Sequence, residues 1–317
     1  MEQDKPTTKI AGIDVSKLKL DVAVHGQDAI SQVTNTPAGF TELGPWLRSH
    51  RVTRVGLEAT GGYERAVVAW LQAEGFEVVV HQPLEVRLFA RLKRRKAKSD
   101  RIDAYLIAAA TAQVDGVKAA SDPLLVELAE RMTAYEQASD QLAQLKTFLE
   151  HVTLPDLEAG YAAQIRQVRE WKRGLLRDLL KRIKARPDLA RRYQLLLSLP
   201  GPGPVTAASL VIRMPELGKL EQGQAAALIG VAPFDRDSGQ YKGQRHIWGG
   251  RARPRRMLYL AALAAKRCDP ASRAFAERLV KAGKPPKVAI TAVMRKLIEA
   301  ANIVLKRGTP WVIQTAA

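Results

Sequence analysis

Four acidic residues have the types and spacing that suit metal-dependent chemistry. Asp14 and Glu58 each close a short apolar run, and Asp100 and Asp103 lie three residues apart. Residues at i and i+3 share one face of a helix, so the two later carboxylates can aim at one point. Oxygen-rich groups of this kind bind Mg²⁺ or Mn²⁺, and two such ions can support phosphodiester cleavage. The four acids therefore predict a Mg²⁺ (or Mn²⁺) site for phosphoryl transfer.

Each acid also has a purely structural interpretation. Asp14 can cap a turn, and Glu58 can pair with Arg54 or Arg65. The two later acids can simply form an acidic first helical turn, which the helix dipole favours. Glu64 is expected to be an ordinary surface residue of a helix. These interpretations stay open at the level of single residues, and the order of the surrounding elements favours the metal site.

The residues around the acids predict three strands followed by alternating helices and strands. Apolar runs and period-two alternation indicate the strands, and Gly-rich turns separate them from the helices. This is the element order of an RNase H-like domain, and it puts Asp14 and Glu58 at strand ends. The predicted ranges are strands 9–14, 18–25 and 29–34, helix 39–49, strand 54–58, helix 63–74, strand 76–81 and a helix opening near residue 99.

The remainder of the chain is predicted to be mostly helical. Residues 124–193 contain apolar positions at three- and four-residue spacing, and an interruption over 153–160 around Pro155 favours two helices that can pair as a coiled coil. The Gly/Pro turn within 197–208 resembles a helix-hairpin-helix, which either grips a phosphate or simply joins packed helices. The predicted fold class is α/β plus α, with a nuclease domain at 1–115, a helical coiled-coil connector at 116–195 and a mostly helical C-terminal domain at 196–317.

Composition favours a polyanionic partner. The 317 residues include 50 Lys and Arg against 32 Asp and Glu, giving a formal charge of +18. Cys268 is the single cysteine, which excludes an intrachain disulfide framework and cysteine-rich zinc sites. No apolar stretch approaches the roughly 20 residues of a membrane span, so we expect a soluble, cytoplasmic protein with no membrane partner. Neither a Walker motif nor a dinucleotide fingerprint is present, which argues against a nucleotide-driven motor.

Two basic clusters are candidate nucleic-acid contacts. One precedes the paired aspartates, and the other lies in the Gly-rich segment 231–256, where each neutralised phosphate would steepen the salt dependence of binding. Such runs are usually solvated faces, but a polyanion would make use of cations in both of these places. The predicted contacts are Lys93, Arg94, Arg95, Lys96, Lys98, Arg236, Lys242, Arg245, Arg251 and Arg253.

Three short stretches contain the four acids, and four further stretches follow along nearly the whole chain. The first three are Gly-Ile-Asp-Val-Ser-Lys at 12–17, Leu-Glu-Ala-Thr-Gly-Gly-Tyr at 57–63 and Lys-Ser-Asp-Arg-Ile-Asp-Ala at 98–104. The later ones are 199–203, 227–233, 237–243 and 294–297. Together, in this order and at these separations, they resemble the DEDD-type insertion-sequence transposases of the IS-one-ten and IS-eleven-eleven group.

This resemblance implies a RuvC-like nuclease domain and a C-terminal transposase domain with a nucleophilic serine, which Ser238 matches. Such a serine forms a covalent phosphoserine link that conserves bond energy for rejoining. The resemblance also implies a homo-oligomer, dimers pairing into tetramers, in which the serine of one subunit approaches the acids of another. It further implies donor and target DNA as substrates and a structured non-coding (bridge) RNA as guide. The expected activity is that of a transposase, a site-specific DNA recombinase.

Local alternatives to these roles remain. Residues 237–239 can be a simple turn, since Asp, Ser and Gly are common turn formers. Tyr241 is a second possible nucleophile, while His246 and Trp248 suit acid–base and stacking roles or local packing. Two other functions compete with transposition, namely a metal-dependent junction-resolving nuclease that uses water and a non-catalytic nucleic-acid-binding protein.

Overall fold

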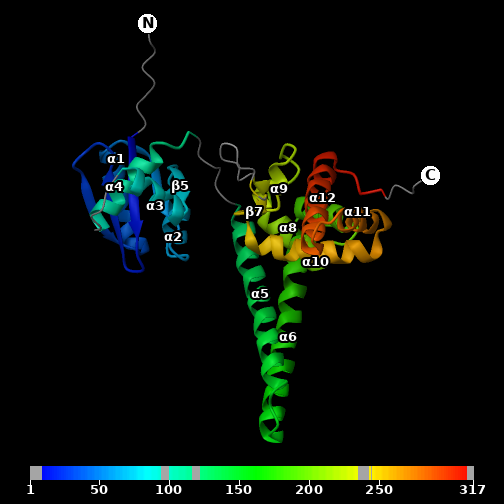
Figure 1. Ribbon diagram of the computed structural model, residues 1–317. Coiled ribbons are helices and arrows are strands. Elements are labelled where there is room, and N and C mark those ends of the chain that lie inside the picture. Colours follow the sequence, from blue (N-terminus) through cyan, green and yellow to red (C-terminus); the bar gives the residue numbers. More distant parts are fainter. Residues whose placement is uncertain (1–8, 94–99, 116–121, 235–242, 244, 313–317) are drawn as a thin grey trace. The chain divides into compact units, whose positions relative to one another are not determined.

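The protein forms two compact units, Met1–Ser121 and Asp122–Ala317. The computed structural model describes residues 9–93, 100–115, 122–234, 243 and 245–312, with the side chains of residues 100–102 outside that description (Figure 1). Each unit has its own core, and each is described separately below. The predicted three-part division, with boundaries near residues 115 and 195, stays a prediction.

The first unit is built on a five-stranded sheet with the order β3-β2-β1-β4-β5. The first three strands pair antiparallel, whereas β4 and β5 run parallel to β1. This is the RNase H-like arrangement predicted from the element order, and the observed strands lie within about two residues of the predicted ones. The strands are β1 Lys9–Val15, β2 Lys19–Val24, β3 Ile30–Thr34, β4 Val52–Glu58 and β5 Glu77–His81.

Helices cover both faces of this sheet. One face carries the main apolar core, where Ile13 and Leu57 pack with buried leucines of α1 (Pro37–Ser49) and α2 (Arg65–Ala73). The opposite face carries α4 (Asp100–Thr111), which contacts β1, β2 and β4. The alternation of side chains along each strand thus separates an apolar layer from a second layer under α4.

The structure adds a helix, α3 (Pro83–Leu92), that the sequence reasoning did not predict. Gln82 caps it and exchanges hydrogen bonds with Glu85 in a capping box, and Pro83 occupies the first helical position. Both features are start signals that the sequence contains. Val86 and Phe89 of α3 pack with Ile107 of α4.

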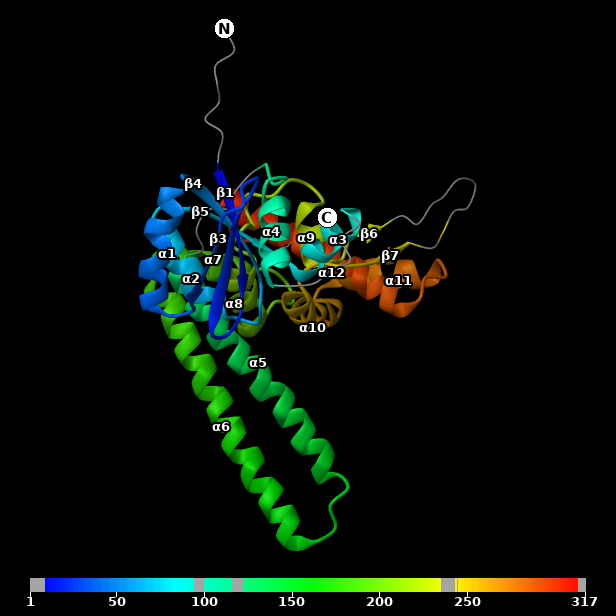
Figure 2. The same cartoon turned by 90° about the vertical axis from the view of Figure 1, so that its left-hand side faces the viewer.

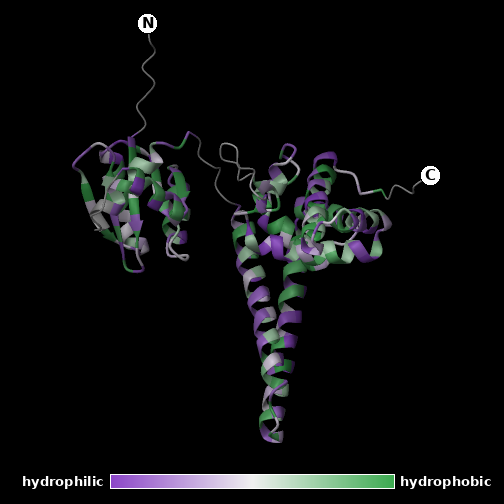
Figure 3. Ribbon diagram, viewed as in Figure 1, coloured by the Kyte–Doolittle hydropathy of each residue, from purple (hydrophilic) through white to green (hydrophobic). Residues whose placement is uncertain are grey.

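The second unit begins with a long helical hairpin. Helix α5 (Pro123–Leu149) and helix α6 (Pro155–Ala185) lie side by side in both views and are joined by a short turn (Figures 1 and 2). The predicted interruption was too wide, because Pro155 starts α6 rather than breaking it, as a proline at the first helical position can. Hydrophilic and hydrophobic residues alternate along both helices (Figure 3), and Leu142 and Ile165 are buried between them. The coiled-coil description stays a prediction.

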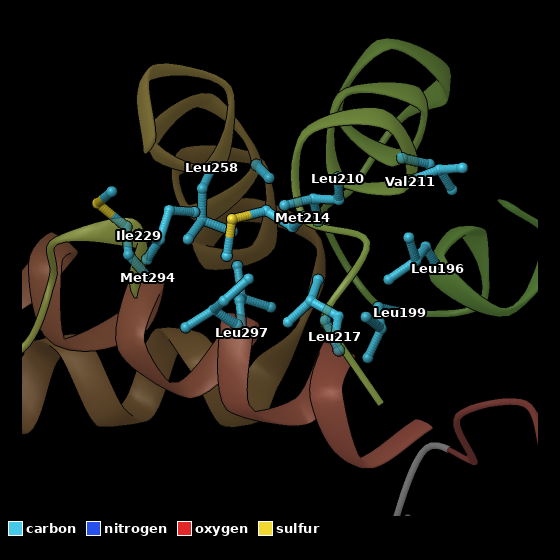
Figure 4. Packing of buried hydrophobic residues seen from close by; sticks show 14 of the residues in the cluster. Leu196, Leu199, Leu210, Val211, Met214, Leu217, Ile229, Leu258, Met294 and Leu297 are labelled. Atoms are coloured by element: carbon cyan, nitrogen blue, oxygen red, sulfur yellow. The ribbon is translucent and has the colours of Figure 1, made fainter. Parts of the chain in front are cut away.

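The other helices of this unit surround an apolar core. The described helices after α6 are α7 Pro187–Leu197, α8 Pro204–Arg213, α9 Gln224–Ile229, α10 Ala252–Cys268, α11 Pro270–Lys281 and α12 Pro286–Arg307. In Figure 4, Leu210 of α8 and Met214, the residue that follows this helix, lie beside Leu258 of α10 and Leu297 of α12. Two short strands, β6 Pro233–Phe234 and β7 His246–Ile247, pair antiparallel between α9 and α10.

The Gly/Pro turn between α7 and α8 packs tightly against α10. Gly201 has a φ of 101°, and a Cβ there would overlap the carbonyl oxygen of Ala261. Close packing of helices therefore accounts for this glycine, and the helix-hairpin-helix description stays a prediction. Among the described helices, none is long and apolar enough to cross a membrane.

Candidate active site

Asp14 and Glu58 lie at the carboxyl ends of neighbouring parallel strands. Ile13 of β1 pairs with Leu57 of β4, so the following residues, Asp14 and Glu58, are neighbours at the same edge of the sheet. Asp14 is the next-to-last residue of β1, and Glu58 is the last of β4. Both side chains are half-buried.

Two glycines show which face of the sheet these carboxylates occupy. A Cβ on Gly12 would overlap backbone atoms of Ala104 and Ala108 in α4, and a Cβ on Gly56 would overlap the side chain of Thr111. Since residues two apart on a strand share a face, Asp14 and Glu58 project on the α4 side. The same packing brings the helix that carries Asp103, the neighbour of Ala104, against β1.

The structure adds two titratable residues that the sequence reasoning missed. Asp21 of β2 pairs directly with Asp14, and His81 of β5 pairs with Glu58. Residues opposite each other in a sheet share a face, so the four side chains form a row across β2, β1, β4 and β5. We call Asp21, Asp14, Glu58 and His81 the polar row.

The outer members of the polar row are buried and hydrogen-bonded. The Asp21 carboxylate accepts a hydrogen bond from Gln32 Nε2 (2.6 Å) and lies 3.3 Å from Lys19 Nζ. His81 Nε2 lies 2.8 Å from Thr111 Oγ1. Burial lowers the pKa of His81, and Glu85, 3.8 Å from its Nδ1, opposes that shift only in part. The period-two pattern of residues 19–23 was the signal that could have placed Asp21 beside Asp14.

The turn after Glu58 is held by Glu64. Its carboxylate accepts hydrogen bonds from the backbone N–H groups of Thr60 (3.1 Å) and Gly62 (2.9 Å). Burial acts to raise the pKa of Glu64, but backbone hydrogen bonds outweigh it and lower that pKa. Glu64 therefore shapes the loop next to Glu58, beyond the surface role that the sequence suggested.

The later pair of acids lies at the start of α4. Asp100 is its first residue, with a side chain outside the described part, and the Asp103 side chain is half-buried. Asp14, Glu58 and Asp103 each make a polar interaction in the structure. In the described residues, no three His, Cys, Asp or Glu side chains are arranged to hold a metal.

The donor chemistry nevertheless fits a hard divalent cation. Asp14 and Glu58 project toward α4, the helix that carries Asp100 and Asp103, and carboxylates are the oxygen ligands that Mg²⁺ and Mn²⁺ prefer. Two observations support a metal site here: the ligands are carboxylates, and Asp14 and Glu58 share the face of the sheet on which Gly12 and Gly56 contact α4. Asp14, Glu58, Asp100 and Asp103 are the residues that would hold it.

Ser238, the predicted nucleophile, lies outside the described residues. The same is true of Arg94, Arg95, Lys96, Lys98, Arg236, Tyr241 and Lys242. Pro233 of β6 pairs with Ile247 of β7, so the chain leaves and re-enters the described part at adjacent points on either side of Ser238. His246 of β7 and Trp248, the residue after that strand, are both exposed, Trp248 with 72% of its surface accessible.

The described members of the basic clusters differ in their surroundings. Lys93 is exposed, with its Nζ 5.5 Å from the Phe89 ring centroid, and Arg245 is exposed. Arg251 instead forms a bidentate ion pair with Glu216, with N–O distances of 2.6 and 2.8 Å. Arg253 donates to the buried Glu136 (2.7 Å), so these two arginines also hold the second unit together.

Comparisons with known proteins match two transposase families to successive parts of the chain. A DEDD transposase family associated with IS110 matches residues 11–154, and the transposase IS116/IS110/IS902 family matches residues 193–277. The pilin gene-inverting protein of Moraxella bovis is 25% identical over 315 residues, which cover 95% of this chain and 96% of that protein.

Two further similarities cover less of the chain. An uncharacterized 43.6 kDa protein of insertion element IS110 from Streptomyces coelicolor is 28% identical over 159 residues, 50% of this chain and 38% of that protein. The structure of T. thermophilus RuvC with a Holliday junction substrate has 17% identity and a TM-score of 0.28, covering 33% of this chain and 92% of that one.

The sheet order and the acids at its central strand ends define an RNase H-like domain, here followed by a mostly helical unit. Because the two family models match successive parts of the chain, the chain belongs to the IS110 family of transposases. Members of this family are recombinases, enzymes that act on DNA.

Proposed function

We propose that this transposase cuts and rejoins DNA strands with Ser238 as nucleophile and with Asp14, Glu58, Asp100 and Asp103 as ligands of Mg²⁺ or Mn²⁺. The observation that supports the acidic part is the shared face of Asp14 and Glu58, under the helix that carries Asp103. A bound divalent ion would supply charge stabilisation for the reacting phosphate. The identity of Ser238 rests on the family resemblance.

The chemistry conserves the number of phosphodiester bonds. Ser238 Oγ would attack phosphorus, forming a phosphoserine bond as one P–O bond of the strand breaks. The serine proton passes to a base, and the departing strand end takes up a proton as a hydroxyl. Attack by a hydroxyl end on the phosphoserine reverses these steps and reseals a strand. No external energy source is needed.

The name of the Moraxella bovis relative favours rejoining over simple hydrolysis. Inverting a gene requires that both cut ends be joined again in the new orientation, which a hydrolytic nuclease does not do. With 25% identity along almost the whole length of both proteins, the same reaction class is proposed for this chain. A junction-resolving nuclease and a non-catalytic binding protein are the outcomes that the experiment below separates.

The experiment traps a covalent protein–DNA adduct on a labelled substrate containing the element's ends. Wild type should form an adduct in Mg²⁺ that resists denaturation, and Ser238→Ala should form none while still binding DNA. If Ser238→Ala cuts the strand as fast as wild type without an adduct, water is the nucleophile and the proposal fails. If Asp14→Asn leaves recombination in cells unchanged, the acidic site has no catalytic role.

Assembly and RNA guidance belong to the same proposal. The family resemblance supports a dimer or tetramer in which the serine of one protomer acts with the acids of another, and a structured RNA as guide. Mixing Ser238→Ala with Asp14→Asn protomers should restore adduct formation if the two halves of the site come from different subunits. Purified protein should lose recombination after ribonuclease treatment and regain it when the element's RNA is added.

A further inference from the structure

A small pocket lies in the second unit where the β6–β7 pair meets α12. It has a volume of about 260 Å³. Its apolar walls include Pro233, Ile247, Val288 and Ala292, and two arginines, Arg245 and Arg295, also line it. No acidic side chain lines it among the described residues, and the positive charge of Arg295 suits an anionic ligand.

The pocket adjoins the ends of the segment that contains the proposed nucleophile. Pro233 and Ile247 are a directly paired couple of β6 and β7, and Ser238 lies five residues beyond Pro233. Arg245 is the last residue before β7. A ligand in this pocket would therefore be bound by the residues that anchor both ends of that segment.

The size and lining fit one flat heterocycle. Pockets for drug-sized ligands typically measure about 300–1,000 Å³, so this one suits a smaller group. Aliphatic walls contact the faces of a base, and an arginine can stack on it or bind the adjoining phosphate. Arg295 is exposed on α12, and in the described chain no carboxylate pairs with it.

We propose that this pocket holds one unstacked base of the DNA substrate, with Arg295 on the adjoining phosphate. This rests on the proposed function, since it names the part of the substrate strand that the pocket takes. Extracting one base from its stack would fix the register of the strand on the second unit. A base from either DNA strand could enter this pocket, so the two probes below are single strands.

The test compares two fluorescent probes, a short oligothymidylate and an abasic oligomer of the same length, binding to the full-length protein. Both carry the same phosphates, and only the first has bases to insert. Wild type should bind oligothymidylate about tenfold more tightly, equivalent to about 1.4 kcal/mol. Arg295→Ala should weaken both probes equally and reduce the log–log salt slope by about 0.7.

A pocket-filling variant localises the effect. Ala292→Phe should bring the two affinities within about twofold, whereas Ile303→Phe, an exposed position on the same helix, should keep the tenfold difference. If Ala292→Phe fails to fold by circular dichroism, Val288→Phe blocks the same pocket from a position with 48% of its surface exposed. If a folded pocket-filling variant keeps the tenfold preference for oligothymidylate, or if wild type shows no preference, the inference is overturned.

This result is separable from the proposed chemistry. Ser238→Ala should keep the probe preference, because the serine takes no part in inserting a base. If Ser238→Ala loses the covalent adduct and wild type binds the two probes equally, the proposed function stands and the pocket assignment is wrong. If Ser238→Ala still forms the adduct and wild type prefers oligothymidylate, the pocket remains a nucleotide site and the serine mechanism is wrong.

Discussion

His81 Nε2 lies 2.8 Å from Thr111 Oγ1, and this buried hydrogen bond ties strand β5 to the end of helix α4. Thr111 donates its own hydroxyl proton to the carbonyl oxygen of Ile107 (2.7 Å), so His81 Nε2 carries the proton that it donates to Thr111. The other end of α4 carries Asp100 and Asp103. The bond therefore helps to fix the helix of the later acids on the sheet that carries Asp14 and Glu58.

Stability should fall on acidification because of His81. Its folded pKa is lowered from 6.5 by burial, with Glu85 opposing in part. Below about pH 6.5 the unfolded chain takes up a proton that the folded chain does not, so the free energy of unfolding falls as pH falls, by up to about 1.4 kcal/mol per pH unit. The decline stops below the folded pKa. Urea unfolding from pH 8 to pH 5 measures it.

A glutamine variant isolates this contribution. His81→Gln should remove the part of the pH dependence that comes from this residue, while the exposed His25→Gln should retain it. If the unfolding free energy of His81→Gln depends on pH as steeply as that of wild type, the buried imidazole does not control the acid sensitivity.

Gly12→Ala should displace α4 from the sheet. The new Cβ would overlap backbone atoms of Ala104 and Ala108, which cannot turn aside as a flexible side chain can. We expect a loss of at least about 2 kcal/mol in unfolding free energy, comparable to overpacking a core. Recombination should fall further than DNA binding, because Asp103 moves with the helix. Gly160→Ala, in α6 with open space around it, should be neutral or stabilising by up to about 1 kcal/mol.

Divalent metal binding should depend on Asp14. Asp14→Asn removes one anionic oxygen donor, and losing several kcal/mol of charge stabilisation corresponds to a fall of about a hundredfold or more in strand cleavage. Calorimetric titration with Mn²⁺ should show weaker binding in this variant. Glu42→Gln, which removes an exposed carboxylate of α1, should leave the titration unchanged. Equal Mn²⁺ affinity in wild type and Asp14→Asn would exclude Asp14 as a ligand.

Glu136 should be a strong determinant of stability in the second unit. Its buried carboxylate accepts hydrogen bonds from Arg213 (3.1 Å) and Arg253 (2.7 Å) and so links α5, α8 and α10. Burial lowers the pKa of Arg213, and Glu136 opposes that shift. Glu136→Ala leaves Arg213 without a counter-charge and should lower the free energy of unfolding by about 3–5 kcal/mol.

Two comparisons test this assignment by urea unfolding. Arg253→Ala should cost only about 1 kcal/mol or less, since its side chain is 49% exposed. Glu158→Gln, exposed in the first turn of α6, should change little. If Glu136→Ala and Glu158→Gln were equally stable, the buried ion pair would carry no net energy.

Local patterns predicted the elements of the first unit but missed α3. The strands around Asp14 and Glu58 were found because apolar runs and alternation reflect which residues a sheet buries. Helix α3 was missed although Gln82, Pro83 and Glu85 are ordinary start signals. The width of the break before α6 was also wrong, because Pro155 is as acceptable at the start of a helix as between two helices.

The sequence by itself determined the order of strands and helices along the first unit, the two acids at neighbouring strand ends and the basic character that suits a polyanionic partner. Only the tertiary structure placed Asp21 opposite Asp14, His81 beside Glu58 and α4 directly on Gly12. It also showed that Arg251 and Arg253 are held by Glu216 and Glu136. The physical reason is that periodicity is encoded within a few residues, whereas register and helix docking arise from contacts between residues far apart in the chain.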